Sequence, residues 1–463
     1  MNNKFLLLIG FLIFNSFSAQ EITGSWKGDL EVQGNRLPLI INIQQDTDGY
    51  KSTLDSPLQG AEGIPLEKTL FVNSTLSFEQ TAMNAKFTGT LKDSEITGTF
   101  NQNGMALPLR LKPFDKTKNE DKTLEILKLS NTTESLKKIN DYISFVEKNN
   151  VLAGELSIFK DGKEIYSKNF GEKNLPDFKN SNQVFQIGSV SKTMTAIMIF
   201  KLIENKQLSL SDQLSQFYPQ IPGSEKITIA HLLNHSAGLG DYVQGKDDPK
   251  WLLKKITDQQ IVDRIIDQGT LFEPGKNQQY SNSGYYLLTK ILEKLSKKSY
   301  AENLNQYIIK PLQLKEFYTS GQKPAYVHKS YFYDKKWLPV NDFDFNNIVG
   351  VGDIATTPYN LNLIINAIFD RKIVSEESLN SMMPDTQRFG KGLAVVPFHS
   401  KIFVGHSGGT YGTNSLMIYN GEDDISISYS LNADRIGIAG NEFVVALFSF
   451  LYGVDYEFPK INK

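Results

Sequence analysis

The stretch Phe185-Gln-Ile-Gly-Ser-Val-Ser-Lys-Thr-Met-Thr-Ala196 decides the fold of this chain. It opens a predicted helix, Thr193–Asn205, and a spacing of three places Ser189 and Lys192 on one face of the first helical turn. A serine hydroxyl is a weak nucleophile until a neighbour removes its proton, and a lysine whose charged form is disfavoured by burial can do so at neutral pH. Backbone N–H groups at the helix start can also stabilise an oxyanion. The stretch therefore predicts an activated serine.

Taken alone, Ser-x-x-Lys would equally describe a helix-capping serine beside a solvated lysine, so the motifs that follow it matter. They are, in chain order, Leu232-Leu-Asn-His235-Ser-Ala-Gly238-Leu, Phe272-Glu-Pro274-Gly275, Tyr280-Ser-Asn282, Gly350-Val-Gly352-Asp353 and Gly405-His406-Ser407-Gly408-Gly409. Their order and spacing resemble the landmarks of the serine β-lactamase-like family, the group of class C β-lactamases, esterases and D-aminopeptidases. The resemblance covers roughly residues 135–455.

This resemblance implies a set of catalytic residues. Ser189 would be acylated, Lys192 would act as a base or proton partner, and Tyr280 would serve the leaving group and the deacylating water as general acid and base. Which of Lys192 and Tyr280 takes the first proton stays open, because coupled groups can share it. Asn282 would hydrogen-bond the substrate and Lys192. The backbone N–H groups of Ser189 and Gly409 would form the oxyanion hole.

The last motif departs from the pattern of penicillin-binding enzymes. Those enzymes usually carry Lys-Thr-Gly where this chain has His406-Ser407-Gly408, and a histidine is mostly neutral at pH 7 unless its pKa is shifted. We therefore expect His406, Gly408 and Gly409 to line a substrate site for esters or for amides of D-amino acids and small peptides, rather than for β-lactams. The alternative is a penicillin-binding protein or peptidoglycan sensor without efficient turnover.

Two other interpretations fail on residue order or type. Gly405–Gly409 satisfies the Gly-x-Ser-x-Gly elbow of α/β-hydrolases, but that fold needs an acid and then a histidine later in the chain, and no histidine follows His406. His231 and His235 stand four apart without the glutamate of a His-Glu-x-x-His zinc site. We expect His231 to end a short helix and His235 to shape the following turn, and neither a metal nor a cofactor is implied.

The length of the chain, 463 residues, exceeds the roughly 250–300 at which one core stops growing, so two domains are expected. Residues 20–113 alternate short strands with turns, which predicts a small antiparallel β-barrel-like domain whose first and last strands pair. Its Gly24-Ser-Trp26-Lys-Gly28 resembles an accessory module of exported hydrolases. Residues 114–132 are predicted to be a linker, and residues 133–463 a serine β-lactamase-like domain with an antiparallel sheet flanked by helices and a helical subdomain. The fold class is thus α+β, multidomain.

Composition and the start of the chain restrict location and partners. The 49 basic and 51 acidic residues form no long run of one sign, so nothing indicates a nucleic-acid partner, and the absence of cysteine excludes disulfides and cysteine nucleophiles. Residues 1–19 carry Lys4, an apolar run and small residues ending at Ala19, which predicts a signal peptide shorter than a membrane span. We expect a periplasmic or secreted protein acting on a small-molecule or peptide substrate, with cell-wall fragments as further candidate partners.

Overall fold

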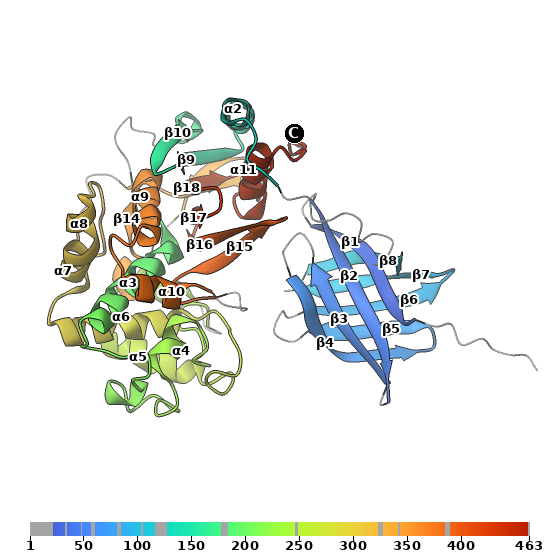
Figure 1. Cartoon of the computed structure of the whole chain (residues 1–463), viewed down its shortest axis with the longest axis horizontal. Coiled ribbons are helices and arrows are strands. Elements are labelled where there is room, and N and C mark those ends of the chain that lie inside the picture. Colours follow the sequence, from blue (N-terminus) through green and yellow to red (C-terminus); the bar gives the residue numbers. More distant parts are fainter. Residues whose placement is uncertain are drawn as a thin grey trace, which may run out of the picture. The chain divides into compact units, whose positions relative to one another are not determined.

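The computed structural model describes residues 22–461 except 33–34, 48, 57–60, 81–84, 103–104, 116–126, 177–183, 246–248, 323–326, 341–342 and 385–388. The chain divides into two compact units, Met1–Thr123 and Leu124–Lys463 (Figure 1). The signal peptide expected at residues 1–19 lies outside the described residues, as does most of the expected linker. Among the helices that are described, none combines the length and apolar character needed to cross a membrane.

The first unit is a closed barrel in which each strand pairs with the next. The strands are β1 (Gly24–Val32), β2 (Asn35–Asp46), β3 (Gly49–Ser56), β4 (Ala61–Val72), β5 (Thr75–Gln80), β6 (Ala85–Lys92), β7 (Glu95–Gln102) and β8 (Met105–Phe114). The barrel closes where Ser25 and Lys27 of β1 pair with Phe114 and Lys112 of β8. The predicted pairing of the first strand with the last is confirmed, and closure leaves no exposed sheet edge.

The barrel interior is filled with side chains. Along β6 the buried and exposed residues alternate, so that Phe87 and Leu91 face the core while Thr88 and Thr90 face solvent. The rings of Phe78 and Phe87 stack with their centroids 5.2 Å apart, and Trp26 is also buried there. An eight-stranded barrel is just wide enough for its own side chains to fill. A packed apolar core therefore stabilises this unit.

The second unit is built on one mainly antiparallel sheet with the order β10-β9-β18-β17-β16-β15, to which the β12–β13 hairpin adds through β12. Its strands are β9 (Leu152–Lys160), β10 (Lys163–Phe170), β12 (Tyr331–Asp334), β13 (Lys336–Pro339), β15 (Ala394–Phe398), β16 (Lys401–Thr410), β17 (Thr413–Asn420) and β18 (Ile425–Asp434). β9 pairs with β18, although the two strands lie near opposite ends of this unit's sequence. Early and late segments of this unit therefore meet in one sheet.

Helices cover both faces of this sheet and also form a separate layer (Figure 1). They are α2 (Thr132–Lys148), α3 (Ser191–Glu204), α4 (Ile229–Leu233), α5 (Asp258–Gln268), α6 (Asn282–Ser296), α7 (Tyr300–Leu304), α8 (Lys310–Leu312), α9 (Pro358–Phe369), α10 (Glu376–Met382) and α11 (Asn441–Tyr452). α2 and α11 bury their apolar faces against Leu156 and Ile158 of β9. Ser157, which points the opposite way because strand side chains alternate, bonds Asn362 of α9.

Helix α3 lies at the centre of the second core. Its buried residues occupy all sides of the helix, from Ser191 to Phe200, and a helix that is apolar all round belongs in the interior. It packs with α6 and with the other short helices around it in one apolar cluster. The sheet flanked by helices, the helical subdomain and the preceding barrel confirm the predicted α+β multidomain fold class. Because α3 is held on all sides, its first turn is a rigid platform.

Candidate active site

The serine of the deciding stretch lies in η4 (Gly188–Val190), a single 3-10 turn that leads directly into α3. The preceding strand β11 (Phe185–Gln186) pairs with β14 (Ala355–Thr356), which holds the turn against the Gly350–Asp353 motif. Lys192 lies in the first turn of α3, and its Nζ donates to the Ser189 Oγ at 3.0 Å. The spacing of three thus places the two side chains in direct contact.

Lys192 is buried without a carboxylate in hydrogen-bond contact in the described part of the chain. Its side chain has no exposed surface, and its Nζ donates to the carbonyl oxygen of Val351 at 2.8 Å. Nζ also lies 5.0 Å from the Tyr280 ring centroid and 5.8 Å from that of Tyr285. Burial lowers the pKa of Lys192 to about 7, although the negative charge of Asp241 acts in the opposite direction. A large share of the amine is therefore neutral at neutral pH.

The Gly350–Asp353 motif shapes the loop that offers this carbonyl. Gly350 has a φ of +72°, and a Cβ built there would lie 2.0 Å from the Thr289 Oγ1. Its N–H donates to the Asp353 Oδ1 at 2.7 Å, while its carbonyl accepts from Thr195 Oγ1 of α3 at 2.7 Å. The first bond closes the loop on itself, and the second fastens it to α3 at Thr195, one turn after Lys192. The sequence motif identified this loop as part of the site. No sequence pattern predicted that Lys192 would donate to the carbonyl of Val351.

Tyr280 approaches the nucleophile from the segment before α6. Its hydroxyl donates to the Ser189 Oγ at 2.6 Å, so two side chains converge on one oxygen. Removal of the phenol from water raises the pKa of Tyr280 above its ordinary value, and the group remains a protonated phenol at neutral pH. The Tyr280 ring packs against those of His235 and Phe389, with centroids 4.5 and 5.9 Å away. This packing orients the hydroxyl.

Glycines let strand β16 touch the nucleophile turn. A Cβ built on Gly408 would lie 2.1 Å from the Ile187 carbonyl oxygen and 2.7 Å from the Ser189 backbone nitrogen. A Cβ on Gly188, whose φ is +52°, would lie 2.6 Å from the Gly409 nitrogen. Only glycine fits at such distances. The backbone amides of Ser189 and Gly409, expected to form the oxyanion hole, are therefore brought to one place by this contact.

Asn282 has a partner that differs from the expected one. Its Nδ2 donates to the Asp241 Oδ2 at 2.8 Å and its backbone N–H donates to the same oxygen at 3.1 Å, while Lys192 donates to Val351 and Ser189. Asp241 was not identified from the sequence. Its position two residues before Val243, whose N–H it accepts at 2.8 Å, has the signature of an Asx turn, but that signal is local and does not indicate Asn282.

The histidines of the motifs are neutral and structural. Burial lowers the pKa of His406 to about 4, and its Nδ1 lies 2.6 Å from the Ser407 carbonyl oxygen. His235 has a φ of +62° and accepts from the Ser281 N–H at 3.2 Å, as expected of a residue that shapes a turn. His231 lies in the last turn of the five-residue helix α4, as expected, and its side chain also completes a capping box with Thr228 at the start of that helix.

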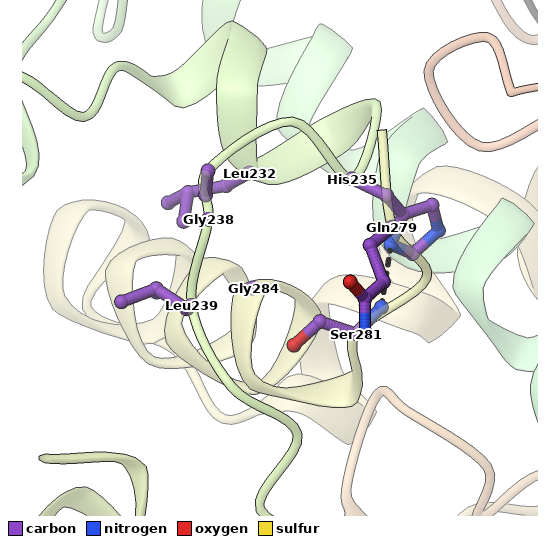
Figure 2. Close-up of a pocket in the computed structure, with 8 residues that line it drawn as sticks. Leu232, His235, Gly238, Leu239, Gln279, Ser281 and Gly284 are labelled. Carbon is purple, nitrogen blue, oxygen red and sulfur yellow. Dashed lines mark hydrogen bonds between the residues drawn. The ribbon is translucent and has the colours of Figure 1, made fainter. Parts of the chain in front are cut away.

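A small pocket lies beside His235 (Figure 2). Its lining residues are Leu232, His235, Ala237, Gly238, Leu239, Gln279, Ser281 and Gly284. Ser189, Lys192 and Tyr280 are not among them, so this pocket is separate from the reacting atoms. No group of three or more histidine, aspartate and glutamate side chains suited to a metal ion occurs in the ranges that the structure covers.

Comparison with known proteins agrees with this geometry. A family model described as Beta-lactamase matches residues 141–439, a segment that contains every site residue named above. The teichoic acid D-alanine hydrolase of Staphylococcus aureus (strain MRSA252) is 27% identical over 320 residues, which are 66% of this chain and 76% of that protein. Penicillin-binding protein 4* of Bacillus subtilis (strain 168) is 28% identical over 336 residues, covering 66% of this chain and 74% of that protein.

Solved structures show the same fold. The D-amino acid amidase of Ochrobactrum anthropi SV3, in complex with L-phenylalanine amide, superposes with a TM-score of 0.60 at 21% identity and covers 68% of this chain and 99% of its own. The octameric penicillin-binding protein homologue of Pyrococcus abyssi gives a TM-score of 0.57 at 26% identity, covering 68% of this chain and 77% of its own. The resemblance inferred from the motifs is therefore confirmed at the level of family and fold.

Proposed function

The chain belongs to the beta-lactamase family, and we propose that it is a serine hydrolase that transfers the acyl group of D-amino-acid esters or amides to water through an acyl-Ser189 ester. The observation that carries this proposal is the convergence on one oxygen of Lys192 Nζ, at 3.0 Å, and the Tyr280 hydroxyl, at 2.6 Å. A nucleophile within hydrogen-bond reach of a base, beside oriented backbone amides, is the arrangement that acyl transfer requires.

Of the two candidate bases, Lys192 fits the first proton transfer better. The pKa of Lys192 is lowered to about 7, whereas that of Tyr280 is raised, so at pH 7 the free lone pair belongs to the amine. The Oγ of Ser189 forms a bond to the substrate carbonyl carbon while its proton passes to Nζ. The negative charge on the carbonyl oxygen is then stabilised by the backbone amides of Ser189 and Gly409.

Collapse of this intermediate breaks the bond to the leaving group. The alcohol or amine leaves with a proton from the Tyr280 hydroxyl, and the ammonium of Lys192 returns its proton to Tyr280, so both groups regain their starting states. In deacylation a water attacks the ester carbon and gives up one proton by the same route. The bond to Oγ breaks, Oγ is protonated, and the free acid departs.

The electrostatics of the site favour D-amino-acid esters and amides over β-lactams. His406, at the position of the lysine of penicillin-binding enzymes, has its pKa lowered to about 4 and supplies no permanent cation for a substrate carboxylate. Two of the similar proteins are named a teichoic acid D-alanine hydrolase and a D-amino acid amidase. The substrate class that these names share is the one that a site without a fixed cation can accept.

The decisive experiment is labelling by a fluorophosphonate, followed by intact mass measurement and peptide mapping. We expect one adduct on Ser189 that disappears in Ser189→Ala and persists in the matched control Ser407→Ala, the serine of the rejected Gly-x-Ser-x-Gly elbow. An adduct on Ser407 would contradict the proposal. Turnover of a D-alanine ester should continue beyond one equivalent, and a reaction that stops after one equivalent would instead favour the penicillin-binding or sensor alternative.

We also propose that the protein is exported, with residues 1–19 removed as a signal peptide and residues 20–113 forming an accessory domain ahead of the hydrolase. The basic start, the short apolar run and the small residues ending at Ala19 support export. Cell-wall fragments that carry D-amino acids are then the accessible substrates. Fractionation of the producing cells with N-terminal sequencing tests this: a cytoplasmic protein with an intact residue 1 would exclude it.

A further inference from the structure

We propose that Asp241 is a positioning residue that fixes the Asn282 amide with its carbonyl oxygen available to the substrate, and that the site therefore selects substrates with a free α-ammonium group over N-acylated ones. This proposal rests on the proposed function, because it concerns the same site. It concerns whether the α-amino group of the substrate is free or acylated, which the nucleophile and its proton partners do not determine.

The orientation of the Asn282 amide follows from the chemistry of its partner. An ionised carboxylate can only accept hydrogen bonds, and the Asp241 Oδ2 lies 2.8 Å from the terminal amide of Asn282. If the amide were turned over, two oxygens would face each other at this distance without a hydrogen between them. The NH₂ group must therefore face Asp241. The Oδ1 atom, which can only accept, is what Asn282 can offer to Lys192 or to a ligand.

Asp241 is itself held firmly. Its Oδ1 accepts from the backbone N–H groups of Val243 at 2.8 Å and Gln244 at 3.0 Å, and its Oδ2 accepts a second bond from the backbone of Asn282. Tyr242 between them is fully buried, and its N–H donates to the Ser283 Oγ of α6 at 3.1 Å. The loop is thus tied to the start of α6 at several points, so the carboxylate that orients the amide is itself held in place.

The charges around the site also favour a substrate with a positively charged group. Lys192 is substantially neutral, His235 and His406 have pKa values lowered by burial, and Tyr280 is a neutral phenol. Asp241 is the acidic side chain beside these groups, and its negative charge acts on Lys192. A substrate ammonium would meet an acceptor oxygen and a nearby negative charge, whereas an N-acylated substrate has no positive charge for Asp241 to attract.

The test compares kcat/KM for D-alanine methyl ester and N-acetyl-D-alanine methyl ester, which share one leaving group, with the full-length mature protein. We expect the wild type to prefer the free amine by about tenfold or more, and Asp241→Asn and Asp241→Ala to reduce this preference about tenfold, mainly through KM. The matched control is Asp434→Asn, because Asp434 also accepts backbone N–H bonds, from Ile436 and Gly437, without touching the site residues. The control should keep the preference.

A second readout separates recognition from a merely structural role. The preference should fall as the pH rises above about 8, where an α-amino group loses its proton, because a neutral amine no longer attracts a carboxylate. Equal rates for both esters in the wild type, or an unchanged preference in folded Asp241 variants, would overturn the proposal. If the variants fail to fold, the wild-type ratio and its pH dependence still decide. Fluorophosphonate labelling run in parallel tests the proposed function separately. Failure to label Ser189 would contradict the hydrolase function itself and not only the preference for a free amine.

Discussion

At the scale of single residues, the site depends on a lysine that the fold keeps out of water. Lys192 is fully buried on the first turn of α3, and in the described residues its bonds go to a hydroxyl and a carbonyl. Transfer of an ammonium group to such surroundings costs free energy, which the protein recovers in part by leaving the amine neutral. The same burial that destabilises the folded chain makes the amine a usable base.

The pH dependence of acylation should report this amine directly. Because the neutral form of Lys192 accepts the proton of Ser189, the rate of fluorophosphonate labelling should rise with pH, with a midpoint near the pKa of about 7, and level off above it. Stopped-flow or quenched labelling gives the profile when it is measured from about pH 5 to about pH 9, roughly two pH units on each side of that pKa. A profile that is flat across this range would argue against Lys192 as the base.

Replacement of the lysine should separate activity from stability. We expect Lys192→Met to slow labelling of Ser189 by about a hundredfold or more, because no other neutral base contacts the Ser189 hydroxyl among the residues that the structure describes. The pKa of Lys192 is lower in the folded than in the unfolded chain, so the unfolded chain binds the extra proton between pH 7 and about 10, and the wild type loses stability as the pH falls through that range.

The Lys192→Met variant does not titrate there. Its Tm should therefore exceed that of the wild type by most at pH 7 and below, and the difference should shrink toward pH 9. Differential scanning calorimetry of both proteins at several pH values measures it. A variant that is less stable than the wild type at every pH would show that the hydrogen bonds of Nζ outweigh the cost of burying the amine.

At the scale of elements, the oxyanion site is a contact between a strand and a turn. β16 can lie against η4 because Gly408 and Gly188 carry no side chains, and each would place a Cβ within 2.7 Å of backbone atoms across the contact. Backbone cannot move aside as a flexible side chain can. The separation of β16 from η4 therefore sets the distance between the amides of Ser189 and Gly409.

Gly408→Ala should push these elements apart. We expect the rate of Ser189 labelling to fall by about a hundredfold, because a displacement of about 1 Å at a reacting centre has an effect of this size. We also expect a lower Tm. The control Gly421→Ala tests the loss of a glycine alone, since a Cβ there would meet only Tyr419 Cε1 at 3.6 Å, an ordinary contact. Full activity in Gly408→Ala would mean that the amides are not held by this contact.

At the scale of the whole molecule, two units each have a core of their own. The barrel closes on itself between β1 and β8, and the second unit contains every residue of the candidate site. The linker expected at residues 114–132 lies between the end of β8 at Phe114 and the start of α2 at Thr132, and most of it falls outside the described residues. Units with separate cores are expected to fold independently.

Truncation tests this independence. We expect the fragment Leu124–Lys463 to fold and to keep the rate of Ser189 labelling within about twofold of the full-length protein, because the nucleophile and its partners belong to one core. Circular dichroism and labelling of the fragment measure the two properties. Loss of labelling in a folded fragment would assign the barrel a direct part in the reaction, in place of the accessory role that we propose.

The sequence by itself determined the family, the pairing of the first barrel strand with the last, and the contact of Ser189 with Lys192. These features are short-range or repeated: a spacing of three on a helix, alternation along strands and a series of motifs in fixed order. The tertiary structure alone decided that Val351 would bond Lys192 and that Asp241 would hold Asn282. Those pairs lie 159 and 41 residues apart in the chain, and burial, which sets the charge of Lys192, is a property of the packed core that no local pattern contains.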